Sequence, residues 1–134
     1  MDSETARRRL GDARVGYLAT ADAAGRPHVV PCCFVVEGST VYSAVDGKPK
    51  AGRTLRRVAN VTANPAASLL VDHYDEDWST LWWVRVDGAA RVVTDPAEEA
   101  GALDLLRAKY EQYDRVPLPG PVLAIDVTRW RAWP

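Results

Sequence analysis

The sequence predicts a mainly β fold, a six-stranded antiparallel barrel with peripheral helices. Six runs rich in β-branched and aromatic residues are separated by turn signals of Asp, Gly, Asn and Pro. Most of these runs follow one another closely, as neighbouring antiparallel strands do. The chain has 134 residues, of which 47% are hydrophobic. This length and composition suit a single domain, residues 1–134, with a core of its own.

Local start and stop signals bound each expected element. The strands are expected at residues 15–20, 28–36, 40–45, 67–72, 82–93 and 122–130. The helices are expected at residues 3–13, 51–63 and 96–113. Pro31 interrupts the second strand, which indicates an edge strand, a bulge or a missing backbone N–H where another group approaches. Gly88 indicates a bulge in the long fifth strand, and Pro65 follows the end of the second helix.

The third helix has the clearest signals. Asp95 and Glu98 resemble a capping box, with Pro96 at the first helical position. Apolar residues at helical spacing predict the buried stripe of this helix. The members of this stripe are Ala100, Leu103, Leu106 and Tyr110.

The net charge of −1 hides an uneven distribution of charge along the chain. Positive charge gathers at residues 7–9 and 48–57, whereas residues 72–77 are acidic. This distribution disfavours nucleic acid as a partner and favours a local anionic ligand. No apolar run approaches the roughly 20 residues of a membrane span, so no membrane partner is expected. The N-terminus lacks the apolar segment of a signal peptide, and a cytoplasmic protein is expected.

The stretch from residue 41 to residue 60 has the pattern of an anion site. A strand end formed by Ser43, Ala44 and Val45 is followed by a turn with Lys48 and Lys50 and then by a basic helix. Backbone N–H groups at a helix start, a serine hydroxyl and lysine ammonium groups can all bind one anion. For the helix arginines, two interpretations stay open: a solvated helix face, or a set of anion contacts. The arginines concerned are Arg53, Arg56 and Arg57.

The cysteines and histidines indicate neither a disulfide nor a metal site. Cys32 and Cys33 are adjacent, and in a strand their side chains would point to opposite faces. We therefore interpret them as small core residues. His28 and His73 lie far apart and lack the spacing of metal ligands.

The tryptophans indicate an interface as well as a core. The chain has five, and Trp78, Trp82 and Trp83 lie close together in the sequence. Trp82 and Trp83 would face opposite ways on a strand, so one can enter the core while the other meets a partner or ligand. Arg85 shares the face of Trp83. It is either a surface charge or a group that pairs with an anionic cofactor.

Several motifs in this order resemble the flavin-binding split β-barrel family. They are the GRPHVVP hairpin, Ser43 five residues before Lys48, the LRR segment of the basic helix, the NP that leads a strand, and DW followed by WVRVDG. This family includes pyridoxamine 5′-phosphate oxidases and deazaflavin-dependent oxidoreductases, and the likeness covers nearly the whole chain. The chain is most similar to the branch that uses F420, the 5-deazaflavin coenzyme. The resemblance implies a Greek-key split β-barrel of the FMN-binding type that forms a homodimer with two cofactor sites at its interface.

The resemblance also implies roles for single residues. It places the cofactor phosphate against Ser43 and Lys48, with Lys50 and Arg57 adding charge. The ring would lie against a second set of residues, Pro31, Cys32, Cys33 and Val45, and Ala44 is also expected to bind the cofactor. The other subunit would contribute a third set, Trp78, Trp83 and Arg85. The C-terminal TRWRAWP departs from the arginine and tryptophan pattern of true pyridoxamine phosphate oxidases, which disfavours vitamin B6 oxidation.

The implied function is an oxidoreductase that passes a hydride from reduced F420 to a small unsaturated molecule, with the cofactor supplying the difficult chemistry. The sequence shows no Ser-His-Asp arrangement and no catalytic cysteine context. Two alternatives remain: an FMN-dependent oxidase similar to pyridoxamine phosphate oxidase, and a protein that binds a flavin or haem without turnover.

Overall fold

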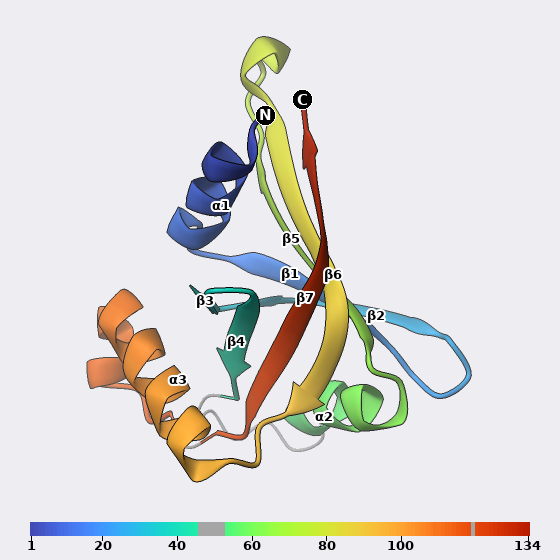
Figure 1. Ribbon diagram of the computed structural model, residues 1–134, viewed down its shortest axis with the longest axis vertical. Helices are drawn as coiled ribbons and strands as arrows, with labels where there is room; N and C mark the ends of the chain where they lie inside the picture. Colours follow the sequence, from blue (N-terminus) through green and yellow to red (C-terminus); the bar gives the residue numbers. More distant parts are fainter. Residues whose placement is uncertain (46–52, 119) are drawn as a thin grey trace.

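The computed structural model describes residues 1–45, 53–118 and 120–134, and in this part a single curled antiparallel sheet carries three α-helices (Figure 1). The strands are β1 (Gly16–Ala21), β2 (Pro27–Cys32), β3 (Val35–Glu37), β4 (Thr40–Ala44), β5 (Ala66–His73), β6 (Trp82–Val92) and β7 (Val122–Trp133). The helices are α1 (Ser3–Asp12), α2 (Arg53–Ala63) and α3 (Pro96–Lys109), with short 3-10 turns at Trp78–Thr80 and Glu111–Asp114.

The predicted fold class is confirmed, but the predicted number of strands is wrong. The expected strand at residues 28–36 is two strands, β2 and β3, because the chain leaves the first sheet edge at Cys33 and joins the other edge at Val35. The strand order is β2-β1-β5-β6-β7-β4-β3, so β2 and β3 are the two edge strands. Only Cys33 and Phe34 connect them. A sheet whose edges are joined by two residues has to curl into a barrel, and we call this connection the seam.

Two core clusters hold the barrel together. The first fills the barrel interior and includes Leu10, Phe34, Leu69 and Val86, all 0–1% exposed. The second lies between α3 and the outer side of β4 and β7, where Leu106 packs near Tyr42 and Ala124. Each fully buried large apolar side chain contributes about 1.5–3 kcal/mol, so these clusters dominate the stability of the fold.

Two glycines allow close backbone approaches that the barrel needs. A Cβ atom at Gly16 would lie 2.9 Å from Leu69 Cδ1 and 3.1 Å from the Phe34 ring. A Cβ atom at Gly88 would overlap the carbonyl oxygen of Asp126. The register between β6 and β7 shifts at Asp87 and Gly88, which confirms the predicted bulge.

α1 and α3 begin as predicted and end earlier, whereas α2 ends at Ala63 as predicted and its expected start at residues 51–52 lies outside the described residues. Asp95 caps α3 by accepting from the Glu98 N–H at 3.2 Å, with Pro96 at the first turn. The helix ends at Lys109, not at residue 113, because Tyr110 adopts an extended conformation. The predicted stripe is wrong at Ala100, which is exposed, and Ala102 is buried in its place. In the described residues, no helix has the length and apolar run needed to cross a membrane.

Candidate functional site

The strand end predicted to hold a phosphate lies largely inside the barrel. Ser43 is 7% exposed, and its hydroxyl donates to the Cys33 carbonyl at 2.8 Å. Ala44 and Val45 are also buried, and the Val45 N–H donates to the Pro121 carbonyl at 3.0 Å. Ser43 therefore ties β4 to the seam. The single O–H of Ser43 is used in this bond, so the Ser43 oxygen can bind a further group only as a hydrogen-bond acceptor.

The basic segment is described only in part. Lys48 and Lys50 lie outside the described residues. On α2, Arg56 is exposed, and Arg57 is half-buried and close enough to lower the pKa of the Cys32 thiol by its charge. The first turn of α2 carries no acidic residue. This arrangement directs positive charge from α2 toward the end of β2.

Three of the residues expected at the cofactor ring, Pro31, Cys32 and Cys33, lie at the end of β2 and in the seam. Pro31 is exposed on β2, and the expectation of an edge strand is confirmed. Cys32 is 8% exposed and points into the barrel, whereas Cys33 is half-buried in the seam. Both thiols are free. Burial raises the pKa of Cys32, so this thiol stays protonated at neutral pH.

Trp83 and Arg85 lie on the outer side of the sheet, away from the barrel interior that holds Ser43 and Cys32. They line a pocket of about 580 Å³ together with Leu70, Tyr74, Trp82 and Trp133. The Arg85 guanidinium pairs with both Asp87 carboxylate oxygens, at 2.9 and 3.2 Å, and lies 5.9 Å from the Trp83 ring centroid. Arg85 therefore already has a carboxylate partner within its own chain.

Trp78 lies farther out still, at the tip of the hairpin formed by β5 and β6 (Figure 1). Its side chain is 70% exposed, and its indole N–H donates to the Tyr74 hydroxyl at 3.4 Å. Within one chain, then, the structure brings together Ser43, Arg57, Cys32 and Cys33, and separately Trp83 and Arg85. It does not join these two groups, and it links Trp78 to the second only through Tyr74, which lines the same pocket.

Sequence reasoning missed two residues that contact the seam, Lys109 and Tyr110. The Tyr110 hydroxyl accepts from the Phe34 N–H at 3.1 Å, and Lys109 Nζ donates to the Phe34 carbonyl at 2.9 Å. Burial raises the pKa of Tyr110 to about 12 and, with the nearby Arg14 charge, lowers the pKa of Lys109 to about 8. The sequence predicted that the helix continues past both residues, so it did not indicate that their side chains contact the seam.

A second missed group ties α3 to the sheet. The Arg91 guanidinium binds Glu98 at 2.8 Å and Asp126 at 2.7 Å, and the Tyr42 hydroxyl donates to Glu98 at 2.6 Å. These bonds hold the pKa of Glu98 at about 2 and lower the pKa of Asp126. The chain of bonds runs from Tyr42 through Glu98 and Arg91 to Asp126, so this network serves the fold. In the described residues no group of three His, Cys, Asp or Glu side chains is arranged to hold a metal ion.

Comparison with known proteins identifies the family. A model of the family described as pyridoxamine 5′-phosphate oxidase matches residues 3–134. A conserved hypothetical protein from Mycobacterium tuberculosis shares the fold at TM-score 0.77 and 20% identity, over 99% of this chain and 84% of that one. An FAD-binding protein from Mesorhizobium loti does so at TM-score 0.73 and 22% identity, over 98% and 94%.

A heme binding protein from Mycobacterium smegmatis is also similar, at TM-score 0.74 and 22% identity, over 97% of this chain and 52% of that one. Identities this low show a likeness of fold alone. No curated protein matches the chain. The family model spans nearly the whole sequence, and the sheet curls as a split barrel requires. The chain therefore belongs to the pyridoxamine 5′-phosphate oxidase family of split β-barrel proteins.

Proposed function

We propose that this protein is a cytoplasmic F420-dependent oxidoreductase that passes a hydride from the reduced deazaflavin to a small unsaturated substrate. The family is named after an oxidoreductase, which supports the reaction class. The observation that carries the choice of cofactor is the charge of α2. This helix has Arg56 exposed, Arg57 close to Cys32, and no acidic residue in its first turn.

The described residues fit such a cofactor. FMN ends in one phosphate, whereas F420 continues past its phosphate into a tail with several more negative charges. Cations that extend along a helix therefore favour F420. No carboxylate of the described residues pairs with Arg56 or Arg57. Lys48, Lys50 and Arg53 precede them in the sequence and would lengthen the same basic segment.

A bound deazaflavin would supply the hydride, and this chain would bind and orient it. Arg57, with Lys48 and Lys50, would hold the phosphate and the start of the tail. Pro31, Cys32 and Cys33 would offer the ring an edge with no charged side chain. The buried, protonated Cys32 thiol adds no negative charge beside the ring. We propose that residues of the partner subunit would contact the substrate.

We further propose a homodimer formed through the outer side of β2, β1, β5 and β6. The register places Val29, Tyr17, Leu70 and Trp83 on this side. Val29 is 62% exposed and Tyr17 39%, which leaves large apolar side chains in water. Covering this side with a second copy would bury them and would bring Trp78, Trp83 and Arg85 toward the partner's cofactor.

Light scattering is expected to give about twice the chain mass of 14.7 kDa. Val29→Arg, which places a charge within the proposed contact, should yield monomers at micromolar concentration. Ala100→Arg on the exposed side of α3 is the matched control and should stay dimeric. A wild-type monomer that binds cofactor would contradict the roles proposed for Trp78, Trp83 and Arg85.

The second candidate function is a protein that binds FMN, FAD or haem, as an oxidase or without turnover. It is supported by structural neighbours named as an FAD-binding and a heme binding protein. Visible spectra after equilibration of the purified protein with F420, FMN and haem separately distinguish the candidates. We expect F420 to bind at least tenfold more tightly than FMN at low salt. Tighter binding of FMN or haem would transfer the proposal to this second candidate.

A further inference from the structure

The backbone at the seam is held by side chains instead of by strand pairing. The Cys33 carbonyl accepts from Ser43, and the Phe34 N–H donates to the Tyr110 hydroxyl. The Phe34 carbonyl accepts from Lys109 Nζ at 2.9 Å and also lies 3.2 Å from the Tyr110 hydroxyl. The end of α3 therefore fixes the peptide next to Cys33, one of the residues proposed to meet the cofactor ring.

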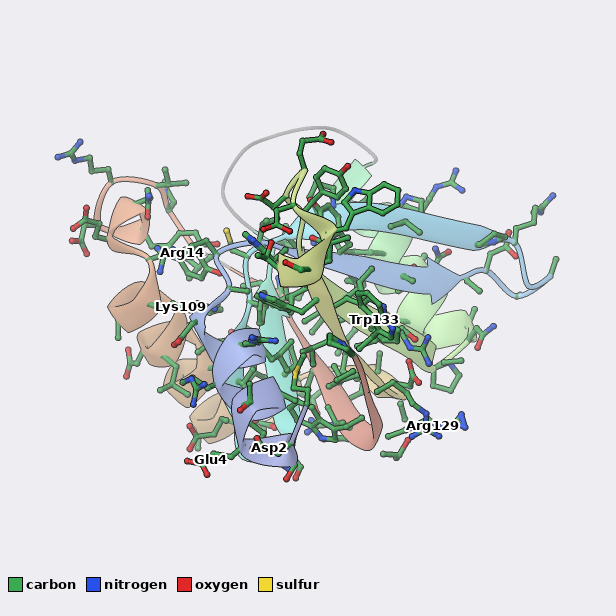
Figure 2. The ribbon with its side chains drawn as sticks, turned by 90° about the horizontal axis from the view of Figure 1, so that it is seen from above. Asp2, Glu4, Arg14, Lys109, Arg129 and Trp133 are labelled. Carbon is green, nitrogen blue, oxygen red and sulfur yellow. The ribbon has the colours of Figure 1, made fainter. Side chains whose placement is uncertain are left out.

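Lys109 brings an unbalanced positive charge to this position. Its Nζ lies 4.0 Å from the Phe34 ring centroid and 5.2 Å from that of Tyr110. No carboxylate of the described residues forms an ion pair with it. Asp12 lies near enough to act on it by charge, and its cationic neighbour is Arg14, whose guanidinium donates to the Lys109 carbonyl at 2.9 Å. Figure 2 shows the two residues side by side where α3 approaches the end of α1.

Burial works against the charge of Lys109, and the pKa of this group is lowered accordingly. A half-buried ammonium beside a second cation loses hydration without gaining a carboxylate partner. The Tyr110 hydroxyl has a single proton, which it donates to the Arg14 carbonyl at 3.0 Å, and it lies 3.2 Å from the Phe34 carbonyl, so Lys109 Nζ is the main donor to that carbonyl. A half-buried cation with a perturbed pKa beside the proposed cofactor edge is a candidate functional group.

We propose that Lys109 is a positioning residue for cofactor binding: its ammonium fixes the seam and, opposite Arg57, makes the Cys32–Cys33 edge attractive to an anionic ligand. This inference rests on the proposed function. The charges of both Arg57 and Lys109 act on the Cys32 thiol, so this residue lies within reach of the two cations. A ligand along this edge would carry its phosphate toward Arg57 and its ring toward Lys109.

The same geometry predicts a dependence on pH. The groups around Lys109 are Asp12 and Arg14 at the end of α1, Cys32 and Cys33 at the seam, and Tyr110 on α3. Tyr110, with its pKa of about 12, stays neutral up to high pH, and Lys109 loses its proton near pH 8. Affinity for the anionic cofactor should therefore fall as the pH rises through about 8.

The sign for stability is opposite. The folded-state pKa of Lys109 is lowered from 10.5 to about 8, so the unfolded chain holds more protons between these two values. The free energy of unfolding should consequently rise with pH across this window. Loss of the Lys109 charge should therefore stabilise the free protein but weaken the complex with the cofactor. A purely structural lysine would not weaken cofactor binding.

The test is Lys109→Met, with F420 affinity and thermal unfolding measured on the same samples. We expect the dissociation constant to rise about tenfold at pH 7, the usual effect of losing a charged contact. The melting temperature should change little, because the hydrogen bond lost at the Phe34 carbonyl offsets the removal of a half-buried charge. The fall in affinity between pH 7 and pH 9 should disappear. Arg107→Met is the matched control, because Arg107 lies on the same helix and pairs only with Asp104, at 3.5 Å.

Lys109→Arg is the second variant, since an arginine keeps its charge throughout this range and should retain at pH 9 the affinity that the wild-type protein shows at pH 7. An unchanged dissociation constant in Lys109→Met, or weakened binding at pH 7 in Lys109→Arg, would overturn the inference. If the wild-type protein binds F420 and Lys109→Met binds it equally well, this inference alone fails. If the wild-type protein binds neither F420 nor FMN, the proposed function fails and takes this inference with it.

Discussion

Phe34→Ala is expected to lower the free energy of unfolding by about 3–5 kcal/mol, the usual cost of removing a buried aromatic ring. Phe34 is completely buried in the barrel interior, and its ring contacts the backbone position of Gly16. Surrounding atoms cannot collapse into the space, because the seam peptide on either side is held by Ser43, Lys109 and Tyr110. The ring therefore closes the barrel where no strand pairing does.

Urea unfolding at a fixed protein concentration measures this loss, since a dimer gains apparent stability with concentration. Phe34→Leu keeps most of the apolar volume and should cost about 1–1.5 kcal/mol. An Ala variant that loses less than about 1 kcal/mol would show that the seam is not packed as described.

Arg91→Met is expected to lower the melting temperature by about 5 °C at neutral pH and to remove part of the acid sensitivity of the fold. Arg91 is bonded to Glu98 on α3 and to Asp126 on β7, and its loss leaves two carboxylates and the Tyr42 hydroxyl without their cation. The carboxylates would then repel each other, so α3 should loosen from the sheet.

The pH dependence follows from the lowered pKa values. Glu98 titrates in the folded protein at about 2 instead of 4.5, and the pKa of Asp126 is also lowered. Their contribution is present above the unfolded-state values and is lost as the pH falls toward 2. Wild-type stability should therefore drop between about pH 5 and pH 2, and the curve of Arg91→Met should be flatter there. Parallel curves for both proteins would contradict this assignment, and Arg107→Met should behave as wild type.

Local signals in the sequence predicted the parts of the fold that depend on neighbouring residues. The cap of α3 at Asp95, the bulge at Gly88 and the edge position of Pro31 each follow from the properties of one or two residues. The seam does not. An apolar run from residue 28 to residue 36 fits one strand as well as two, and only the choice of pairing partners on opposite sheet edges divides it.

The candidate site was predictable to a smaller degree for the same reason. Arg57 and Cys32 are 25 positions apart in the sequence, and their proximity depends on how α2 packs beneath the barrel. Lys109 and Tyr110 were missed because no glycine or proline marks the end of α3 at this point, so the helix was expected to continue. The resemblance to a family, and not the geometry of one chain, is the reason for assigning Trp78, Trp83 and Arg85 to the cofactor site, because these residues lie away from Ser43, Arg57 and Cys32.

Paired titrations of F420 and FMN at low and high salt test the central claim, that the basic segment selects the longer anionic cofactor. The contacts beyond the phosphate would be exposed, so each contributes little and salt screens it. F420 should bind more tightly at low salt, and its advantage over FMN should shrink as ionic strength rises. Arg56→Ala combined with Arg57→Ala should reduce that advantage, whereas Arg107→Ala should not. Tighter binding of FMN at low salt, or an F420 affinity indifferent to both helix substitutions, would contradict this account.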